Sequence, residues 1–125
     1  MANKLITILV LLLGFQSCQI AQNSEIFTIY LVRHSEKELA SENESDPPLT
    51  KCGMQRSESL SIFLDDVNLE AIYSTDYKRT INTALPTANA KALQIKKYNP
   101  RDLVGFSRLL LDAKKDALVV GHSNT

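Results

Sequence analysis

The chain has 125 residues and a formal net charge of zero, and 44% of its residues are hydrophobic while 6% are aromatic. This composition fits one small globular domain and excludes a disordered or collagen-like chain. Because neither sign of charge dominates, nothing in the composition favours nucleic acid or an acidic membrane surface as a partner.

The N-terminal segment has the pattern of an export signal. Lys4 supplies a short positive region, and residues 5–15 form an apolar run that is too short for a transmembrane helix. We expect a signal peptide over residues 1–17, a polar linker over residues 18–25 and one domain over residues 26–125. Cys18 follows a small residue as in a lipobox, but Phe15 and Gln16 match that motif poorly. Two forms of the mature protein therefore stay possible. One is an envelope lipoprotein that touches the membrane only through its lipid, and the other is a free exported or periplasmic protein.

The first part of the domain alternates between strand, loop and helix patterns. Residues 26–32 are almost continuously apolar, which predicts a strand buried on both faces. Residues 35–48 form an acidic loop that ends at two prolines. We interpret it as a solvated surface, with a role in substrate entry as the alternative. Thr50 is placed to cap a helix from about Lys51. The apolar face of this helix is expected to contain Leu60, Phe63, Leu64 and Val67.

Two more strand–helix pairs and a last strand complete the pattern. A short strand is expected over residues 69–73, and a helix from about Arg79 should kink or end early at Pro86. Residues 94–98 form a more polar strand near a sheet edge, and Asp102 opens a third helix from Leu103. Residues 117–121 form a final buried strand. The alternation predicts an α/β fold, a three-layer α/β/α arrangement with a largely parallel sheet.

Residues suited to phosphate chemistry follow three of these strands. Arg33 and His34 come at the end of the first strand, Arg79 comes shortly after the second, and His122 follows the last. Ligands of open α/β sheets bind beyond the carboxyl ends of the strands, so these side chains are expected to converge. Both histidines of the chain fall at such ends, which favours a functional site over packing.

These residues carry a resemblance to a known family. Residues 31–36 resemble the Arg-His-Gly motif of the histidine phosphatase, or phosphoglycerate mutase-like, superfamily, with Ser35 where glycine is common. The turn that contains Gly53, the segment around Arg79 and the Gly-His motif at His122 are similar to three further motifs of the family, in family order. The resemblance covers about residues 28–125 and implies a phosphoglycerate mutase-like fold. Family members continue past the Gly-His motif. We therefore expect this chain to be a fragment, or the product of a truncated reading frame, that lacks the last elements of the fold.

The resemblance implies metal-independent hydrolysis of a phosphomonoester through a phosphohistidine. It assigns nucleophilic attack to His34. Arg33 and Arg79 would grip the phosphoryl oxygens, because guanidinium presents a permanently charged planar fork. His122, as an imidazolium, would donate to the same group, and Ser123 would help to bind the substrate. We expect no cofactor and no metal, and a small phosphomonoester as the partner.

The donor of the proton to the leaving group stays open. Asp102 lies nearest to the position of the catalytic carboxylate in many relatives, but it is equally suited to cap the helix that it precedes. Glu36, two residues after His34, is the rival. Two other functions also stay open. One is a phosphoglycerate mutase-type phosphotransferase, which export disfavours, and the other is a phospholigand-binding module without turnover.

Overall fold

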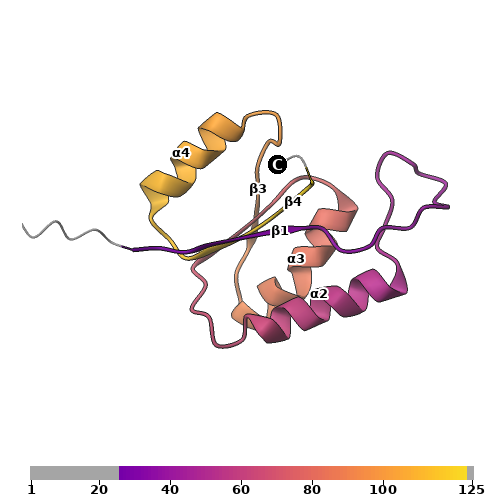
Figure 1. Ribbon diagram of the computed structural model, residues 1–125, viewed down its shortest axis with the longest axis horizontal. Helices are drawn as coiled ribbons and strands as arrows, with labels where there is room; N and C mark the ends of the chain where they lie inside the picture. Colours follow the sequence, from indigo (N-terminus) through magenta and orange to yellow (C-terminus); the bar gives the residue numbers. More distant parts are fainter. Residues whose placement is uncertain (1–25, 124–125) are drawn as a thin grey trace, which may run out of the picture.

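The computed structural model describes residues 26–123, which form a parallel four-stranded sheet with three helices (Figure 1). The strand order is β1-β4-β2-β3, and every neighbouring pair is parallel. The strands are β1 (Ile29–Arg33), β2 (Ala71–Ser74), β3 (Ile95–Lys97) and β4 (Ala117–Gly121), and the helices are α2 (Lys51–Phe63), α3 (Lys78–Lys91) and α4 (Leu103–Ala113). Helix α4 lies on one side of the sheet and α2 and α3 lie on the other (Figure 1). The three-layer α/β/α prediction is confirmed.

The central strands β2 and β4 separate two hydrophobic cores. Ile72 and Leu118 point into a core with residues of α2 and α3. Their neighbours Tyr73 and Val119 point the opposite way, into a core with Phe106 of α4. This alternation follows from the two-residue period of a strand. Every residue of β2 and β4 is buried, so the polar residues that follow these strands are held by a rigid base.

Strand β1 differs from its prediction. It pairs with β4 alone among the described residues, so it lies at the edge of the sheet, and Leu31 is 60% exposed. The expectation of a strand buried on both faces is therefore wrong. An apolar run reports that a strand is hydrophobic, but it does not say how many elements cover it.

Helix α2 begins where its cap predicts, and three of the four predicted apolar residues, Leu60, Leu64 and Val67, contact the core. The Thr50 side chain accepts a hydrogen bond from the Gly53 backbone N–H, as expected of an N-cap. Gly53 and Ser57 of the helix and the C-cap residue Leu64 are buried, whereas Phe63 is 76% exposed. The predicted place of Phe63 on the buried face is wrong, because the small residues of the first two turns set which side of the helix meets the protein.

Helix α3 continues through Pro86 to Lys91, so of the two expected effects of the proline, a kink or an early end, the early end is not found. The buried residues Ala84, Thr87 and Ala88 lie on both sides of the proline, and their packing outweighs the loss of one backbone hydrogen bond. The polar edge strand β3 and the Asp102 cap of α4 are both found where the sequence predicts them.

The predicted signal peptide (residues 1–17), the predicted linker (residues 18–25) with Cys18, and the last two residues of the chain lie outside the described residues. Within residues 26–123, no helix is long and apolar enough to cross a membrane.

Candidate active site

The carboxyl ends of β1, β2 and β4 bring the predicted phosphate-binding residues together. The backbone N–H of His34 donates to the carbonyl of Gly121 at 3.0 Å, which joins the end of β1 to the end of β4. A cavity of about 410 Å³ lies beyond these ends. Its lining includes Arg33, His34, Arg79, His122 and Ser123. The expected convergence of these five residues is therefore found in the structure.

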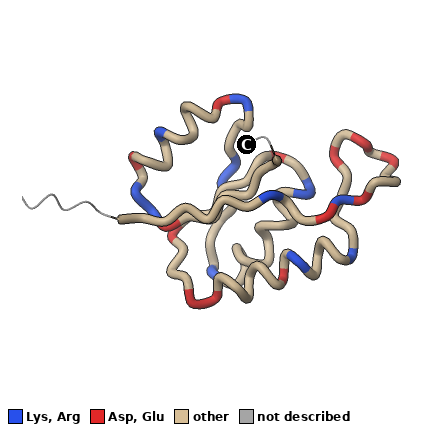
Figure 2. The backbone as a smooth tube through the Cα atoms, viewed as in Figure 1, with Lys and Arg blue, Asp and Glu red and all other residues tan. Residues whose placement is uncertain are grey.

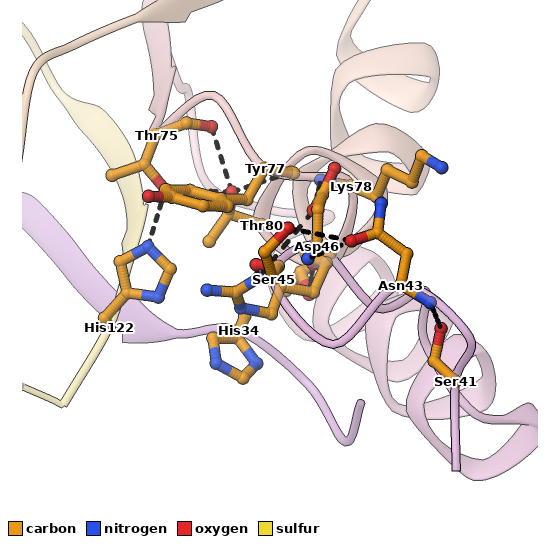
Figure 3. A network of polar contacts seen from close by, with 12 residues as sticks. His34, Ser41, Asn43, Ser45, Asp46, Thr75, Tyr77, Lys78, Thr80 and His122 are labelled. Carbon is orange, nitrogen blue, oxygen red and sulfur yellow. Dashed lines mark hydrogen bonds and ion pairs between the residues drawn. The ribbon is translucent and has the colours of Figure 1, made fainter. Parts of the chain in front are cut away.

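The two imidazoles that line this cavity lie next to each other, in an edge-to-face arrangement (Figure 3). Their centroids lie 5.5 Å apart and the ring planes meet at 69°. The Nδ1 atom of His34 lies 2.7 Å from the backbone carbonyl of Ser35. A carbonyl only accepts hydrogen bonds, so in neutral His34 the proton sits on Nδ1 and the lone pair on Nε2. Of the two nitrogens of neutral His34, Nε2 is thus the one that can act as a base or a nucleophile.

A chain of hydroxyl groups determines the tautomer of His122. Thr80 Oγ1 donates to the carbonyls of Thr75 and Tyr77, both at 2.9 Å, and Thr75 Oγ1 in turn donates to Thr80 Oγ1 at 2.9 Å. With its only proton used in this way, Thr75 Oγ1 accepts from Nε2 of His122 at 3.0 Å (Figure 3). His122 therefore carries a proton on Nε2 and presents Nδ1 on the other side of the ring.

The pKa values of both histidines are below the ordinary 6.5. For His34, burial lowers the pKa, the hydrogen bond to Ser35 opposes it, and the charges of Arg79, Arg33 and Lys37 add to the lowering. For His122, burial is again the main cause of the lower pKa, followed by the charge of Arg79. For each ring, the lowered pKa favours the neutral form before a ligand binds. For His122 the sequence led us to expect an imidazolium. That form requires a nearby negative charge, such as that of a bound phosphoryl group, to raise the pKa of the ring.

The acidic loop holds Arg79 in place. Asp46 Oδ1 accepts from the backbone N–H of Lys78 at 2.8 Å and lies 3.7 Å from Nη1 of Arg79. The guanidinium carbon lies 4.4 Å from the centre of the Tyr77 ring. The Nε atom of Arg79 is buried without a hydrogen-bond partner among residues 26–123. Buried donors are almost always satisfied, so this N–H stands out as a polar group at the cavity that the described residues leave unpaired.

Buried hydroxyl groups hold Ser35 in place. Its backbone N–H donates to Thr83 Oγ1 at 2.9 Å, and its side chain accepts from Ser57 at 3.1 Å. Positive φ values among the described non-glycine residues occur only at Ala92 and Lys114. Serine is thus accommodated at the position where glycine is common in the family, because the backbone there does not require a left-handed conformation.

The two candidate proton donors lie in different places. Glu36 lines a second cavity, which also contains His34 and Arg33, and its carboxylate pairs with Arg56 at 2.6 Å. Asp102 accepts from the backbone N–H of Gly105 at 2.9 Å as the N-cap of α4. It lines a separate cavity without the histidines. The structure therefore places Glu36 at a cavity that adjoins His34 but lacks Arg79 and His122, and it places Asp102 at the start of α4 as a helix cap.

The structure adds residues that the sequence did not single out. Lys37, Tyr77 and Arg101 line the cavity, Thr75 contacts His122, and Asp46 contacts Arg79. The strand-end rule that located His34 also applies to Thr75 and Arg101, which follow β2 and β3. No sequence signal identifies Asp46, because its contact depends on how the loop folds back over α3. No cluster of three or more metal-binding side chains occurs in the described part of the chain.

Comparisons with solved structures support the fold. The protein histidine phosphatase SixA in complex with tungstate has a TM-score of 0.65 and 18% identity, covering 76% of this chain and 69% of that one. The phosphoglycerate mutase of Bacillus anthracis has a TM-score of 0.61 and 16% identity, with 77% and 74% coverage. The alpha-ribazole phosphatase of Shigella flexneri has a TM-score of 0.60 and 17% identity, with 75% and 73% coverage. At these identities the likeness concerns the fold.

The sequence itself matches a family. A search of curated proteins finds no match. Residues 29–99, however, match the model of the histidine phosphatase superfamily, branch 1. Phosphatases and mutases are the activities that this family and the similar structures support. The match spans more than half of the chain and includes Arg33, His34 and Arg79, and the chain belongs to the histidine phosphatase superfamily.

Proposed function

We propose that the chain hydrolyses phosphomonoesters through a phosphohistidine at Nε2 of His34. The observation that carries the proposal is the paired arrangement of the two imidazoles, with Nδ1 of His34 held at 2.7 Å from the Ser35 carbonyl. This contact leaves the Nε2 lone pair available, and the lowered pKa of His34 keeps it unprotonated at neutral pH.

In the first step, Nε2 of His34 attacks phosphorus and the bond from phosphorus to the ester oxygen breaks. Arg33 and Arg79 hold the non-bridging oxygens, including through the unpaired Nε of Arg79. His122, protonated on both nitrogens once the dianion is bound, donates from Nδ1 to the phosphoryl group. In the second step, water attacks phosphorus, the N–P bond breaks, and His34 is regenerated with inorganic phosphate as the product.

The proton of the leaving oxygen comes from Glu36 in this proposal. Its carboxyl group shares a cavity with His34, whereas Asp102 lines a different one. A general acid matters more when the leaving group is a poorer one. Glu36→Gln should therefore lower the rate of hydrolysis of alkyl phosphates far more than that of 4-nitrophenyl phosphate. Asp102→Asn, which retains a good N-cap, should show no such dependence on the leaving group. The reverse pattern would assign the proton to Asp102.

The test of the function is turnover together with a trapped intermediate. The full chain should release 4-nitrophenol from 4-nitrophenyl phosphate, and EDTA should not change the rate. Brief reaction with ³²P-labelled substrate should leave an acid-labile label on the protein. His34→Ala should lose both turnover and label while it remains folded by circular dichroism. If the chain binds phosphate but neither turns over substrate nor accepts label, the proposal is wrong and the chain is a binding module.

A further inference from the structure

The cavity around the histidines is lined by an excess of positive charge. Four of its nine lining residues are permanently cationic, and none is acidic. They are Arg33, Lys37, Arg79 and Arg101. They come from separate parts of the chain: the end of β1 and the loop after it, the start of α3, and the loop after β3. The fold thus gathers cations that are far apart in sequence at one opening.

Most of this charge is not neutralised by the protein. Within residues 26–123, Arg79 has a partner in Asp46, but Arg33, Lys37 and Arg101 form no ion pair. Acidic residues are available nearby, yet they are engaged elsewhere. Glu36 pairs with Arg56 at 2.6 Å, and Asp76, which borders the neighbouring cavity with Arg101, pairs with Lys97 at 2.7 Å. In Figure 2 the acidic positions of the loop after β1 are spread along a segment that projects from the body of the molecule, and of these residues Asp46 pairs with Arg79.

A simple phosphomonoester does not use all of this charge. Arg33 and Arg79 suffice to hold the three non-bridging oxygens of a dianion, because each guanidinium binds them in a fork. Lys37 and Arg101 then remain, on the loops after β1 and β3, without an anionic partner. The charge of Lys37 reaches the reacting groups, since it contributes to the lowered pKa of both His34 and His122. A cavity of about 410 Å³ has room for more than the phosphoryl group.

We propose that Lys37 and Arg101 form a second anion subsite, so that the preferred substrates are phosphomonoesters whose leaving group carries an anionic group of its own. This proposal rests on the proposed function. A carboxylate or a second phosphate would supply the required charge. The two differ in charge and size, and a comparison of matched ligands separates them.

Binding tests the subsite independently of turnover. Methylphosphonate and phosphonoacetate share one phosphonate, but only the second carries a carboxylate, and methylenediphosphonate carries a second phosphonate. Titration calorimetry with the full chain should show that at least one of the two ligands with a second anionic group binds about tenfold more tightly than methylphosphonate, as expected for a charge-assisted hydrogen bond. The preference should shrink with added salt. Which of the two binds more tightly identifies the favoured anion.

The hydrolysis of two matched esters by the wild type and by variants tests whether Lys37 and Arg101 form the subsite. The ratio of kcat/KM for 4-carboxyphenyl phosphate to that for its methyl ester should exceed one, and Lys37→Gln and Arg101→Gln should each lower this ratio. Because both esters use the same phosphoryl site, any shared loss cancels in the ratio. The control is Arg108→Gln, which removes an exposed cation of α4 outside the cavity and should leave the ratio unchanged.

The outcomes separate this inference from the proposed function. Equal binding of all three phosphonates, or an equal loss of preference in Arg108→Gln, would overturn the subsite even if the chain hydrolyses both esters. Tighter binding of the carboxylated or diphosphonate ligand that depends on Lys37 and Arg101 would support the subsite even if no ester is hydrolysed. In that case the proposed hydrolysis alone would fail.

Discussion

At the scale of single residues, the surroundings of His34 determine how activity should vary with pH. In the proposed mechanism the neutral imidazole is the nucleophile, and burial lowers its pKa below 6.5. The reactive form therefore persists to lower pH than in a free histidine, and kcat/KM should fall only when the pH drops through this lowered value. A pH–rate profile with 4-nitrophenyl phosphate measures it. Proton NMR of the two histidines of the chain provides a check, with His122→Asn to assign the signals. An acid limb above pH 6.5 would contradict the prediction.

The hydroxyl of Thr75 gives a second prediction, because it accepts the Nε2 proton of His122. Thr75→Val retains the shape of the side chain but leaves Nε2–H without this acceptor. We expect kcat to fall about tenfold, since an unsatisfied buried group costs about 1–3 kcal/mol, while KM changes less. Thr75→Ser retains the hydroxyl and should restore most of the rate. Imidazole ¹⁵N shifts report the tautomer directly, and an unchanged His122 tautomer in Thr75→Val would refute the role given to Thr75.

At the scale of elements, Gly53 determines how closely α2 approaches the loop after β1. A Cβ built on Gly53 would lie 2.3 Å from the backbone oxygen of Glu36, a distance too short for any contact. Gly53→Ala therefore has to displace backbone rather than a flexible side chain. We expect a loss of about 1–3 kcal/mol in the free energy of unfolding, measured by urea denaturation. Ser59→Ala, at an exposed position of the same helix, should change it by less than about 0.5 kcal/mol.

Displacement of Glu36 should also disturb His34, two residues earlier in the chain. Gly53→Ala is thus expected to lower kcat/KM as well as stability, whereas Ser59→Ala lowers neither. A stable and fully active Gly53→Ala variant would mean that the loop yields easily and that its packing does not position the site.

The elements themselves were largely predictable, and the errors have physical causes. The Thr50 and Asp102 caps, the central strands and the polar edge strand depend on local signals that the sequence displays. The burial of β1 and of Phe63 depends on which other elements cover them. Hydrophobic periodicity does not contain this information. Pro86 was overestimated as a helix breaker because tertiary packing outweighs local preference.

At the scale of the whole molecule, the convergence of His34, Arg79 and His122 was predictable from the rule for strand ends alone. A parallel sheet brings its carboxyl ends to one edge whatever the details of the loops. The contact between Asp46 and Arg79 was not predictable, because it depends on the path of a loop with no regular structure. The tautomers of His34 and His122 could not be predicted from the sequence either. They follow from contacts of about 3 Å between each ring and a carbonyl or hydroxyl group.

The location of the molecule rests on the sequence before the described residues and provides the last prediction. If Cys18 is acylated, the full chain expressed in a Gram-negative host should incorporate labelled palmitate and fractionate with membranes. Cys18→Ser should abolish the label. Cys52→Ser is a matched control, because it removes the only other cysteine, which is exposed on α2, and it should retain the label. A processed but unlabelled wild-type chain in the periplasm would indicate the free exported form. An unprocessed chain in the cytoplasm would refute export, and with it the argument that export disfavours a mutase acting on cytoplasmic substrates.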